Sequence, residues 1–394
     1  MIARYSASGL TNEQMAANPV WVDKTGNGRD LQLKNFSWKR MSGVGGYVQD
    51  FNDFRNNATV DKIRIDEQGS NSIKVTVLTT GIVNAIYIPK NIYQFNKSYF
   101  IKISSEGYDE GDMALSFYAT PTSTATTVTV SLNPNGITEI PAIKEDDFLA
   151  VYLAVGGKVG SITIEQLPLY PGFILGDGVD DFAVTENNLD LEDTYTIYTP
   201  LILLKYGGVV CGKNSDKDFS LNTVISSKSI GFDSANAWSG SIPVDLFEFV
   251  LVACKKSPQT MYVKDLVTGK SNQNKSKEFV PNPRKYFVWR NVGGSWCQVA
   301  IAGQIICNGY YSTDEDDEKV LDWYKKQYPW LFFDQAWTVV GKKPTRTKIV
   351  LLLPTLRAMV MILCCLILGL LKGVATMKKG NMLAIWLLMG WMIR

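Results

Sequence analysis

Histidine is absent from the chain of 394 residues. It is the commonest general base and the commonest zinc ligand in proteins, so its absence excludes Ser-His and Cys-His nucleophiles and argues against a zinc enzyme. Any catalysis by this chain would have to use carboxylates.

The chain also lacks a strong charge of either sign. Its 40 lysines and arginines nearly balance 38 acidic residues, so the sequence carries no electrostatic footprint for nucleic acid. Its six cysteines contain no C-x-x-C pair, which indicates neither a zinc site nor a disulfide framework. Four of them lie in apolar runs such as "GGVVCG", where we expect small buried hydrophobes. The N-terminal stretch "MIARYSASGLTNEQ" has no basic segment followed by an apolar one, so we predict no secretory signal.

Alternation of polar and apolar residues dominates the chain from about residue 70 to residue 340. Stretches such as "SIKVTVL" (72–78), "SYFIKIS" (98–104), "TTVTVSL" (126–132) and "SITIEQL" (161–167) are separated by Gly, Asn, Asp and Pro. Short alternating segments at this spacing are typical of half-buried antiparallel strands. The sequence therefore predicts an all-β fold built from β-sandwiches.

One short helix is predicted at 313–328, in "STDEDDEKVLDWYKKQYP". Ser312 and Glu315 have the spacing of a capping box, and Pro329 would end the helix. The acidic run 314–318 fits the positive end of the helix dipole, which we favour over a metal or catalytic role for these residues.

Two motifs carry a resemblance to a known family. They are "VWVDKTGNGRDLQLKNF" (20–36) and "GFILGDGVDDFAVT" (172–185). In their order and their residue pattern, the two motifs resemble the opening of a laminin-G-like, concanavalin-type lectin domain of the kind found in bacterial surface and phage-tail proteins. The resemblance covers residues 1–46 and 172–335, and it implies a concanavalin-like antiparallel β-sandwich that recognises sugars or surfaces.

The distance between the motifs departs from the family, because roughly 150 positions separate Gly28 from Gly178 where a few tens are usual. The strands between them suffice for a second, jelly-roll-like β-sandwich inserted into a surface loop of the first. We therefore predict a discontinuous lectin-like domain (1–46 plus 172–341), an inserted carbohydrate-module-like domain (48–170) and a hydrophobic tail (342–394).

The hydrophobic tail could be a membrane anchor over residues 349–393. A spanning helix needs about 20 consecutive apolar residues, but Pro354 and Arg357 interrupt the run. A charge near mid-span typically costs about 2.5–3.5 kcal/mol on insertion scales.

The genetic code offers an interpretation of the tail that we favour. In the frame that joins the third base of each codon to the next two, some residues are fixed whatever the synonymous codon: Met359-Val360 gives Gly, Met361-Ile362 gives Asp, and Cys364-Cys365 gives Leu. With permitted residues at the other positions, this frame can read T-G-N-G-N-D-x-x-L-S-N-F and later N-G-V-D-D, which resemble "TGNGRDLQLKNF" and "GDGVDD" in this chain. We predict that the tail is the frameshifted start of a second lectin-like repeat, with the frame lost at about Lys342.

The acidic residues Asp177, Asp180 and Asp181 are a candidate calcium site, since calcium prefers carboxylate and carbonyl oxygens. Asp and Gly are also common in turns for backbone reasons, and we favour a turn here. Gly26, Asn27 and Gly28 are likewise interpreted as a turn first and as a ligand loop second.

Sugar binding would need exposed aromatic rings beside polar groups. The candidates are Trp238, Trp296, Tyr310 and Tyr311, each close to small polar residues. Any of them could instead belong to a core, because tryptophan is usually largely buried. For Trp289, in "YFVWR", we expect the core.

Three functions remain open: a non-enzymatic carbohydrate- or surface-binding protein, a structural spacer that binds nothing, and a glycosidase. The last would need two carboxylates about 5–9.5 Å apart, and no strand shows closely spaced acids. We favour the first, with glycans or a host-surface polysaccharide as partners, calcium as an optional ligand, and an extracellular or virion-associated location. A membrane-anchored form is the alternative if the tail is genuine.

Overall fold

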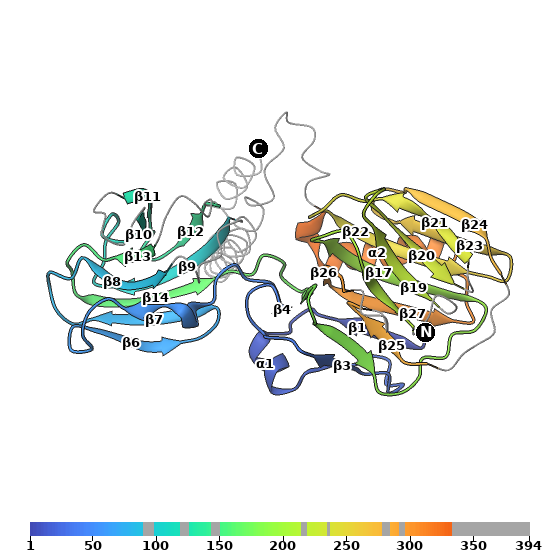
Figure 1. Cartoon of the computed structure of the whole chain (residues 1–394), viewed down its shortest axis with the longest axis horizontal. Coiled ribbons are helices and arrows are strands. Elements are labelled where there is room, and N and C mark those ends of the chain that lie inside the picture. Colours follow the sequence, from blue (N-terminus) through green and yellow to red (C-terminus); the bar gives the residue numbers. More distant parts are fainter. Residues whose placement is uncertain are drawn as a thin grey trace, which may run out of the picture. The chain divides into compact units, whose positions relative to one another are not determined.

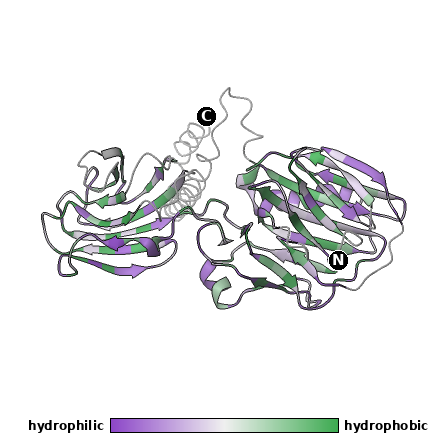
Figure 2. Ribbon diagram, in the orientation of Figure 1, coloured by the Kyte–Doolittle hydropathy of each residue, from purple (hydrophilic) through white to green (hydrophobic). Residues whose placement is uncertain are grey.

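The chain is built almost entirely of antiparallel strands, which confirms the predicted all-β fold class (Figure 1). The computed structural model describes residues 1–89, 98–118, 126–142, 150–213, 219–234, 237–277, 284–290 and 296–332. Their strands form sheets of nine, eight, five and five strands. Figure 2 shows hydrophobic and hydrophilic residues mixed along these strands, as expected where one face of a sheet is buried.

The first sandwich consists of a nine-stranded and an eight-stranded sheet. The nine-stranded sheet contains β1 (Ala3–Ser6), β4 (Gly43–Val44), β15 (Ile174–Asp177), β17 (Tyr195–Leu203), β22 (Phe249–Lys256), β23 (Thr260–Asp265), β24 (Ser271–Lys275), β26 (Gln298–Ile301) and β27 (Gly303–Asn308). The eight-stranded sheet contains β2 (Val20–Trp21), β3 (Leu31–Lys34), β16 (Phe182–Thr185), β18 (Val209–Lys213), β19 (Ser220–Val224), β20 (Ser229–Ser234), β21 (Ala237–Pro243) and β25 (Tyr286–Val288).

The core of this sandwich is centred on stacked tryptophans. Trp289 is fully buried, as the sequence predicts, and its ring lies 6.0 Å from that of Trp21. The Trp289 indole donates a hydrogen bond of 2.9 Å to the Val299 carbonyl. Gly176 leaves room for this ring, because a Cβ there would lie 2.5 Å from Trp289 Cδ1. Three of the expected apolar cysteines are fully buried in this core, and the fourth is partly buried: Cys211, Cys254, Cys297 and Cys307.

The strands β5 to β14 form two five-stranded sheets around a separate hydrophobic core. One sheet contains β5 (Arg55–Asn56), β8 (Asn84–Pro89), β10 (Ala114–Tyr118), β11 (Thr126–Ser131) and β13 (Ala150–Ala154). The other contains β6 (Ile63–Gln68), β7 (Ser72–Val77), β9 (Tyr99–Glu106), β12 (Ile137–Ile140) and β14 (Gly160–Gln166). In β7, half-buried and buried residues alternate strictly, as its sequence pattern predicts. The division into domains at residues 46, 172 and 342 stays a prediction.

Two α-helices are present in the described part of the chain, α1 (Asn12–Ala17) and α2 (Asp314–Gln327). The short helices η1 (Phe51–Asp53) and η3 (Pro329–Leu331) are of the 3-10 type. The helix α2 matches the predicted helix to within one residue at each end. Its capping box is shifted by one residue, since Thr313 and Asp316 form it rather than Ser312 and Glu315. The helix α1 has its own capping box, Thr11 with Gln14, and was not predicted.

The chain divides into two compact units, Met1–Pro329 and Trp330–Arg394. Only residues 330–332 of the second unit are described. The predicted frameshifted tail (342–394) and the alternative anchor (349–393) therefore lie outside the described residues. Among the helices that are described, none is long and apolar enough to span a membrane.

Candidate functional site

The "TGNG" motif forms a turn that is held by a buried carboxylate. Gly26 and Gly28 adopt φ angles of +78° and +66°, a region that glycine enters without steric cost. Burial alone would raise the pKa of Asp23, but hydrogen bonds from the Arg4 amide and from the amide and hydroxyl of Thr25 lower it below its usual value. These contacts tie the turn to β1, so its role here is structural.

The "DGVDD" motif forms the turn between β15 and β16. Asp177 Oδ1 accepts hydrogen bonds from the amides of Val179 and Asp180, at 2.8 and 3.3 Å. Asp181 Oδ2 accepts one from the Asp177 amide, at 2.9 Å. Gly178 has a φ of +77°, and a Cβ there would lie 2.8 Å from Gln298 Cβ. The turn favoured from the sequence is therefore present.

Asp181 is the most perturbed carboxyl group of this turn. Its side chain is almost completely buried, and this burial raises its pKa to about 7. The neighbouring carboxylates of Asp177 and Asp180 act in the same direction, whereas the Ser42 hydroxyl and the Asp177 amide oppose it. Asp181 Oδ1 is buried with no hydrogen-bond partner among the described residues. A buried polar atom without a partner is costly unless a ligand or a proton satisfies it.

The three aspartates fit a calcium ion by distance. One oxygen from each of Asp177, Asp180 and Asp181 lies within 4.8 Å of the others. Two ligands on opposite sides of a calcium ion are about 4.8 Å apart, since each Ca–O bond is about 2.4 Å. Asp181 Oδ1 adds a buried acceptor with no other partner among these residues. When bound, a calcium ion would supply a fixed positive charge at this turn and could accept sugar hydroxyls as ligands.

An aromatic patch directly follows the acidic turn along β16. It consists of Phe182, Phe287, Arg290 and Trp296, all half-buried on the eight-stranded sheet and its flanking residues. The rings of Phe182 and Trp296 lie 6.0 Å apart. The Arg290 guanidinium lies 4.4 Å from the Phe182 ring centre and 4.7 Å from that of Trp296. The structure thus places one predicted site residue, Trp296, against Phe182, which directly follows the predicted acidic cluster in the chain.

Trp238 belongs to the same sheet at its far edge. It lies on β21, where it pairs with Asp233 on β20, and it is half-buried. A Cβ on Gly231 would lie 2.6 Å from Trp238 Cζ2, so the indole rests against the backbone of β20. Trp238 is therefore a partly accessible ring on the same sheet as Phe182 and Phe287, several strands away from them.

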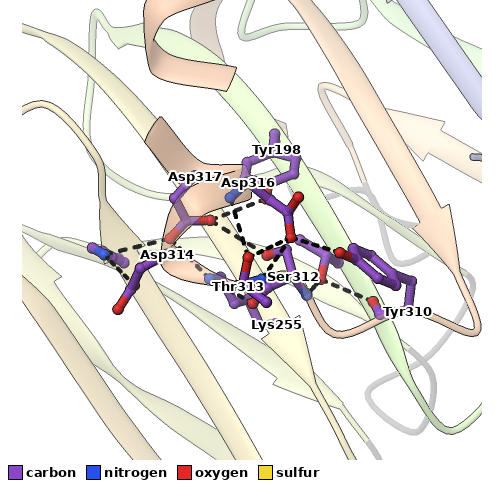
Figure 3. A network of polar contacts seen from close by, with 10 residues as sticks. Tyr198, Lys255, Tyr310, Ser312, Thr313, Asp314, Asp316 and Asp317 are labelled. Atoms are coloured by element: carbon purple, nitrogen blue, oxygen red, sulfur yellow. Dashed lines mark hydrogen bonds and ion pairs between the residues drawn. The ribbon is translucent and has the colours of Figure 1, made fainter. Parts of the chain in front are cut away.

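Tyr310 and Tyr311 lie elsewhere, between β27 and α2. Figure 3 shows Tyr310 beside the first turn of α2. Both are exposed, at 46% and 37%. The Tyr310 hydroxyl donates a hydrogen bond of 2.6 Å to Asp316, and the Lys255 ammonium lies 5.9 Å from the Tyr311 ring centre. These tyrosines contact the residues that hold α2, and they do not join the tryptophans in one site.

The residues that hold α2 form a buried polar network, shown in Figure 3. Asp317 pairs with Lys255 at 2.8 Å and accepts hydrogen bonds from Tyr198 and Ser312 at 3.0 and 3.3 Å. Lys264 reaches Asp317 and Asp314 from β23. The acidic run was assigned from the sequence to the helix dipole alone. Asp317 differs because it points inward and fixes the helix on the nine-stranded sheet.

The sequence reasoning missed Phe182, Phe287 and Arg290. A signal was present, because Phe287 lies between the buried residues Tyr286 and Val288 and must point to the opposite face of its strand. The register that brings β16 beside β25 joins residues about a hundred positions apart, and no local pattern encodes it.

No family model and no curated protein matches this chain. Three solved structures illustrate its similarities. Domain 4 of AbnA, an arabinanase from Geobacillus stearothermophilus in complex with arabinotriose, is 11% identical over 38% of this chain and 80% of its own, with a TM-score of 0.28. Domains LG4-5 of the mouse laminin α1 chain are 11% identical over 56% and 84%, with a TM-score of 0.28. The carbohydrate-binding module CBM66 from Bacillus subtilis is 10% identical over 34% and 81%, with a TM-score of 0.22. Similarities of this strength assign no function.

Proposed function

We propose that this chain is a non-enzymatic carbohydrate- or surface-binding protein, and that the aromatic patch with the adjoining acidic turn is its binding site. The observation that carries the proposal is the position of Trp296 and Phe182, two partly accessible rings 6.0 Å apart, of which Phe182 directly follows the "DGVDD" turn in the chain.

The chemistry of this site suits a sugar. A pyranose has an apolar face that packs on an aromatic ring, and its hydroxyl groups need donors and acceptors at the edge of that ring. The Arg290 guanidinium adds a positive charge beside the rings, 4.7 Å from the centre of the Trp296 ring. Asp180, two residues before Phe182 in the chain, is exposed and offers an acceptor.

A catalytic role is not part of the proposal. Asp181, with a pKa of about 7, has the proton affinity of a general acid. Its side chain is 1% exposed, however, and an acid must reach the bond that it protonates. We assign its raised pKa to the burial of the turn.

The location at an extracellular surface or on a virion extends the proposal and rests on the lectin-like motifs alone. A structural spacer that binds nothing is the second candidate. Asp181 Oδ1, which has no hydrogen-bond partner among the described residues, favours a bound cation over this candidate, because a cation held by the three aspartates would satisfy it.

A glycan array tests the proposal. The full chain, fluorescently labelled, is applied with calcium and with a chelator. We expect binding to a restricted set of glycans, and no binding to any glycan would favour the spacer. Mass spectrometry of the bound glycans follows in solution, and we expect them to remain intact. Shorter products would overturn the non-enzymatic part of the proposal.

A further inference from the structure

One end of the sandwich built from β5 to β14 carries a cluster of exposed apolar side chains. Eleven large hydrophobic side chains are exposed among the described residues of the chain. Four of them lie on the loops at this end: Val60 (73%), Leu78 (43%), Val83 (63%) and Val159 (43%). Single apolar residues are normal on a surface, whereas a cluster of them marks an interaction site. We call the loops that carry them, residues 59–62, 78–83 and 155–159, the apolar tip.

The strand register brings these loops side by side. The strands β14, β7 and β6 are neighbours in one sheet (Figure 1). Gly160 on β14 pairs with Val77 on β7, so Val159 and Leu78 are the next facing positions beyond the strand ends. The Leu78 amide donates a hydrogen bond of 2.8 Å to the Lys62 carbonyl, which holds the loop before β6 beside them. The exposed side chains therefore form one surface.

Backbone hydrogen bonds also fix the loops of the second sheet. The Val155 amide donates to the Val83 carbonyl at 2.8 Å, and the Gly157 amide donates to the Ile82 carbonyl at 3.0 Å. In return, the Gly81 amide donates to the Gly157 carbonyl at 2.9 Å. The loop before β8 is thus tied to the loop after β13. A surface that is already ordered loses little conformational entropy when it binds a partner.

The tip lies at the end of this sandwich that is opposite to its chain connections. The chain enters at Phe51, whose amide donates to the Ser70 carbonyl at 3.0 Å, and leaves at Gln166, whose amide donates to the Asn71 carbonyl at 2.8 Å. Both contacts lie at the turn between β6 and β7, whereas the tip lies at the other ends of these strands. A partner can therefore dock on the tip without displacing the connections.

The charged residues around the tip argue against several partners. Lys158 pairs with Asp112 at 2.6 Å and with Asp109 at 3.3 Å, and the neighbouring Glu110 is exposed. Nucleic acids and anionic membranes need an excess of positive charge, which this end does not offer. The four exposed apolar side chains are aliphatic, so they provide no ring on which a sugar could stack.

The neighbours Asp61 and Lys62 make the tip complementary to itself. Both side chains are exposed, and the Lys62 backbone is bonded to Leu78. A contact with twofold symmetry places the same surface on both partners, so each interaction across it occurs twice. Asp61 of one copy can then face Lys62 of the other, and the reverse, while the two apolar clusters cover each other.

We propose that the apolar tip binds a second copy of this chain in a twofold-symmetric dimer. Its four aliphatic side chains form the centre of the contact, with the Asp61–Lys62 pairs beside them. The inference goes beyond the proposed function and does not depend on it. A dimer carries two copies of the proposed glycan site, which strengthens binding to a surface that displays many glycans.

Sedimentation velocity of the full chain over a concentration series tests this inference. We expect a discrete equilibrium between monomer and dimer with a Kd in the micromolar range, since the contact is small. The double variant Leu78→Ser/Val159→Ser should raise the dimer Kd about tenfold or more, because it removes apolar surface that the dimer would bury. Val22→Ser is the matched control and should leave the Kd unchanged, since Val22 is also 43% exposed but lies outside the tip.

Charge variants identify the partner as a second copy. Asp61→Lys and Lys62→Asp each place like charges opposite one another, so each variant alone should dimerise about tenfold more weakly than the parent chain. An equimolar mixture of the two variants should form heterodimers with a Kd close to that of the parent, because opposite charges then face each other. Binding of an unrelated partner would not be restored by mixing.

Three outcomes would overturn the inference. The first is a full chain that stays monomeric throughout the series. The second is an association that neither the double variant nor the charge variants weaken, which would assign it to another part of the chain. The third is a monomeric chain that binds neutral phosphatidylcholine vesicles and loses this binding in the double variant, which would make the tip a lipid-binding surface. Glycan binding on the array is judged separately, because it depends on the aromatic patch.

Discussion

The Lys255 ammonium lies 2.8 Å from the Asp317 carboxylate, and both side chains are almost completely buried. Removing one partner of such a pair leaves an uncompensated buried charge and typically costs about 3–5 kcal/mol. We expect Asp317→Asn to lower the free energy of unfolding by about 3 kcal/mol in urea denaturation, since Lys255 would lose its charged partner.

Asp314 provides the matched control for this prediction. It pairs with Lys264 from the same turn of α2, but its side chain is 85% exposed. Exposed ion pairs contribute about 0–1 kcal/mol, so Asp314→Asn should change stability little. Equal effects of the two substitutions would contradict the role given to Asp317.

The raised pKa of Asp181 predicts a dependence of stability on pH. In the folded protein its pKa is about 7, against an ordinary value of 3.8. Between these two pKa values the folded state holds a proton that the unfolded state releases. The contribution of Asp181 to stability is therefore greatest below about pH 4 and decreases as the pH rises to about 7. Above that pH it no longer changes. We expect a loss on the order of 2 kcal/mol between pH 5 and pH 8 in a chelating buffer, after solvent screening.

Asp181→Asn tests the source of this loss, because an amide cannot ionise. Urea denaturation at pH 5 and pH 8 should show the slope in the parent chain and a much smaller slope in the variant. The same slope in both would assign the effect to another group.

The acidic turn predicts stabilisation by calcium. A ligand that binds only the folded state at a hundred times its Kd stabilises it by about 2.7 kcal/mol. We expect calcium to raise the Tm in scanning calorimetry, and Asp180→Asn to reduce this rise by removing one carboxylate. Asp190→Asn, which changes an exposed aspartate outside the turn, is the control. An unchanged Tm in calcium would leave the turn with a structural role only.

The tail after Lys342 makes a prediction about its gene. If it is a frameshifted repeat, nucleotide sequencing through that codon should show the other frame open and continuing into a second lectin-like unit. An immediate stop in that frame would contradict the frameshift, and residues 349–393 would then have to be treated as an anchor.

Local patterns predicted much of the fold. The alternation in β7 correctly predicted which of its side chains are buried, because a strand with one buried face has a period of two. The apolar residues around Trp289 correctly predicted that this side chain is buried. The helix α1 was missed because six residues are too few to show a helical period. The capping box of α2 was misplaced by one residue because Ser312 and Thr313 can both cap, and Ser312 instead turns inward to Asp317.

The candidate site was only partly predictable for a different reason. Trp296 and the aspartates stand out by residue type. Phe182 and Arg290 do not, because they become neighbours only through the pairing of strands that are distant in the sequence. Tyr310 and Tyr311 look similar to Trp296 in sequence, yet the fold directs them to α2. Such placement depends on register, which short motifs do not specify.

The most direct test of the account is the affinity of the Trp296→Ala variant for the glycan that the parent chain binds most tightly on the array. Trp323→Ala is the matched control, since this half-buried tryptophan packs on Tyr324 of α2, away from the aromatic patch. By isothermal titration calorimetry, the account predicts a loss of about tenfold or more for Trp296→Ala and an unchanged Kd for Trp323→Ala. A folded Trp296→Ala variant that binds with the parent affinity would contradict it.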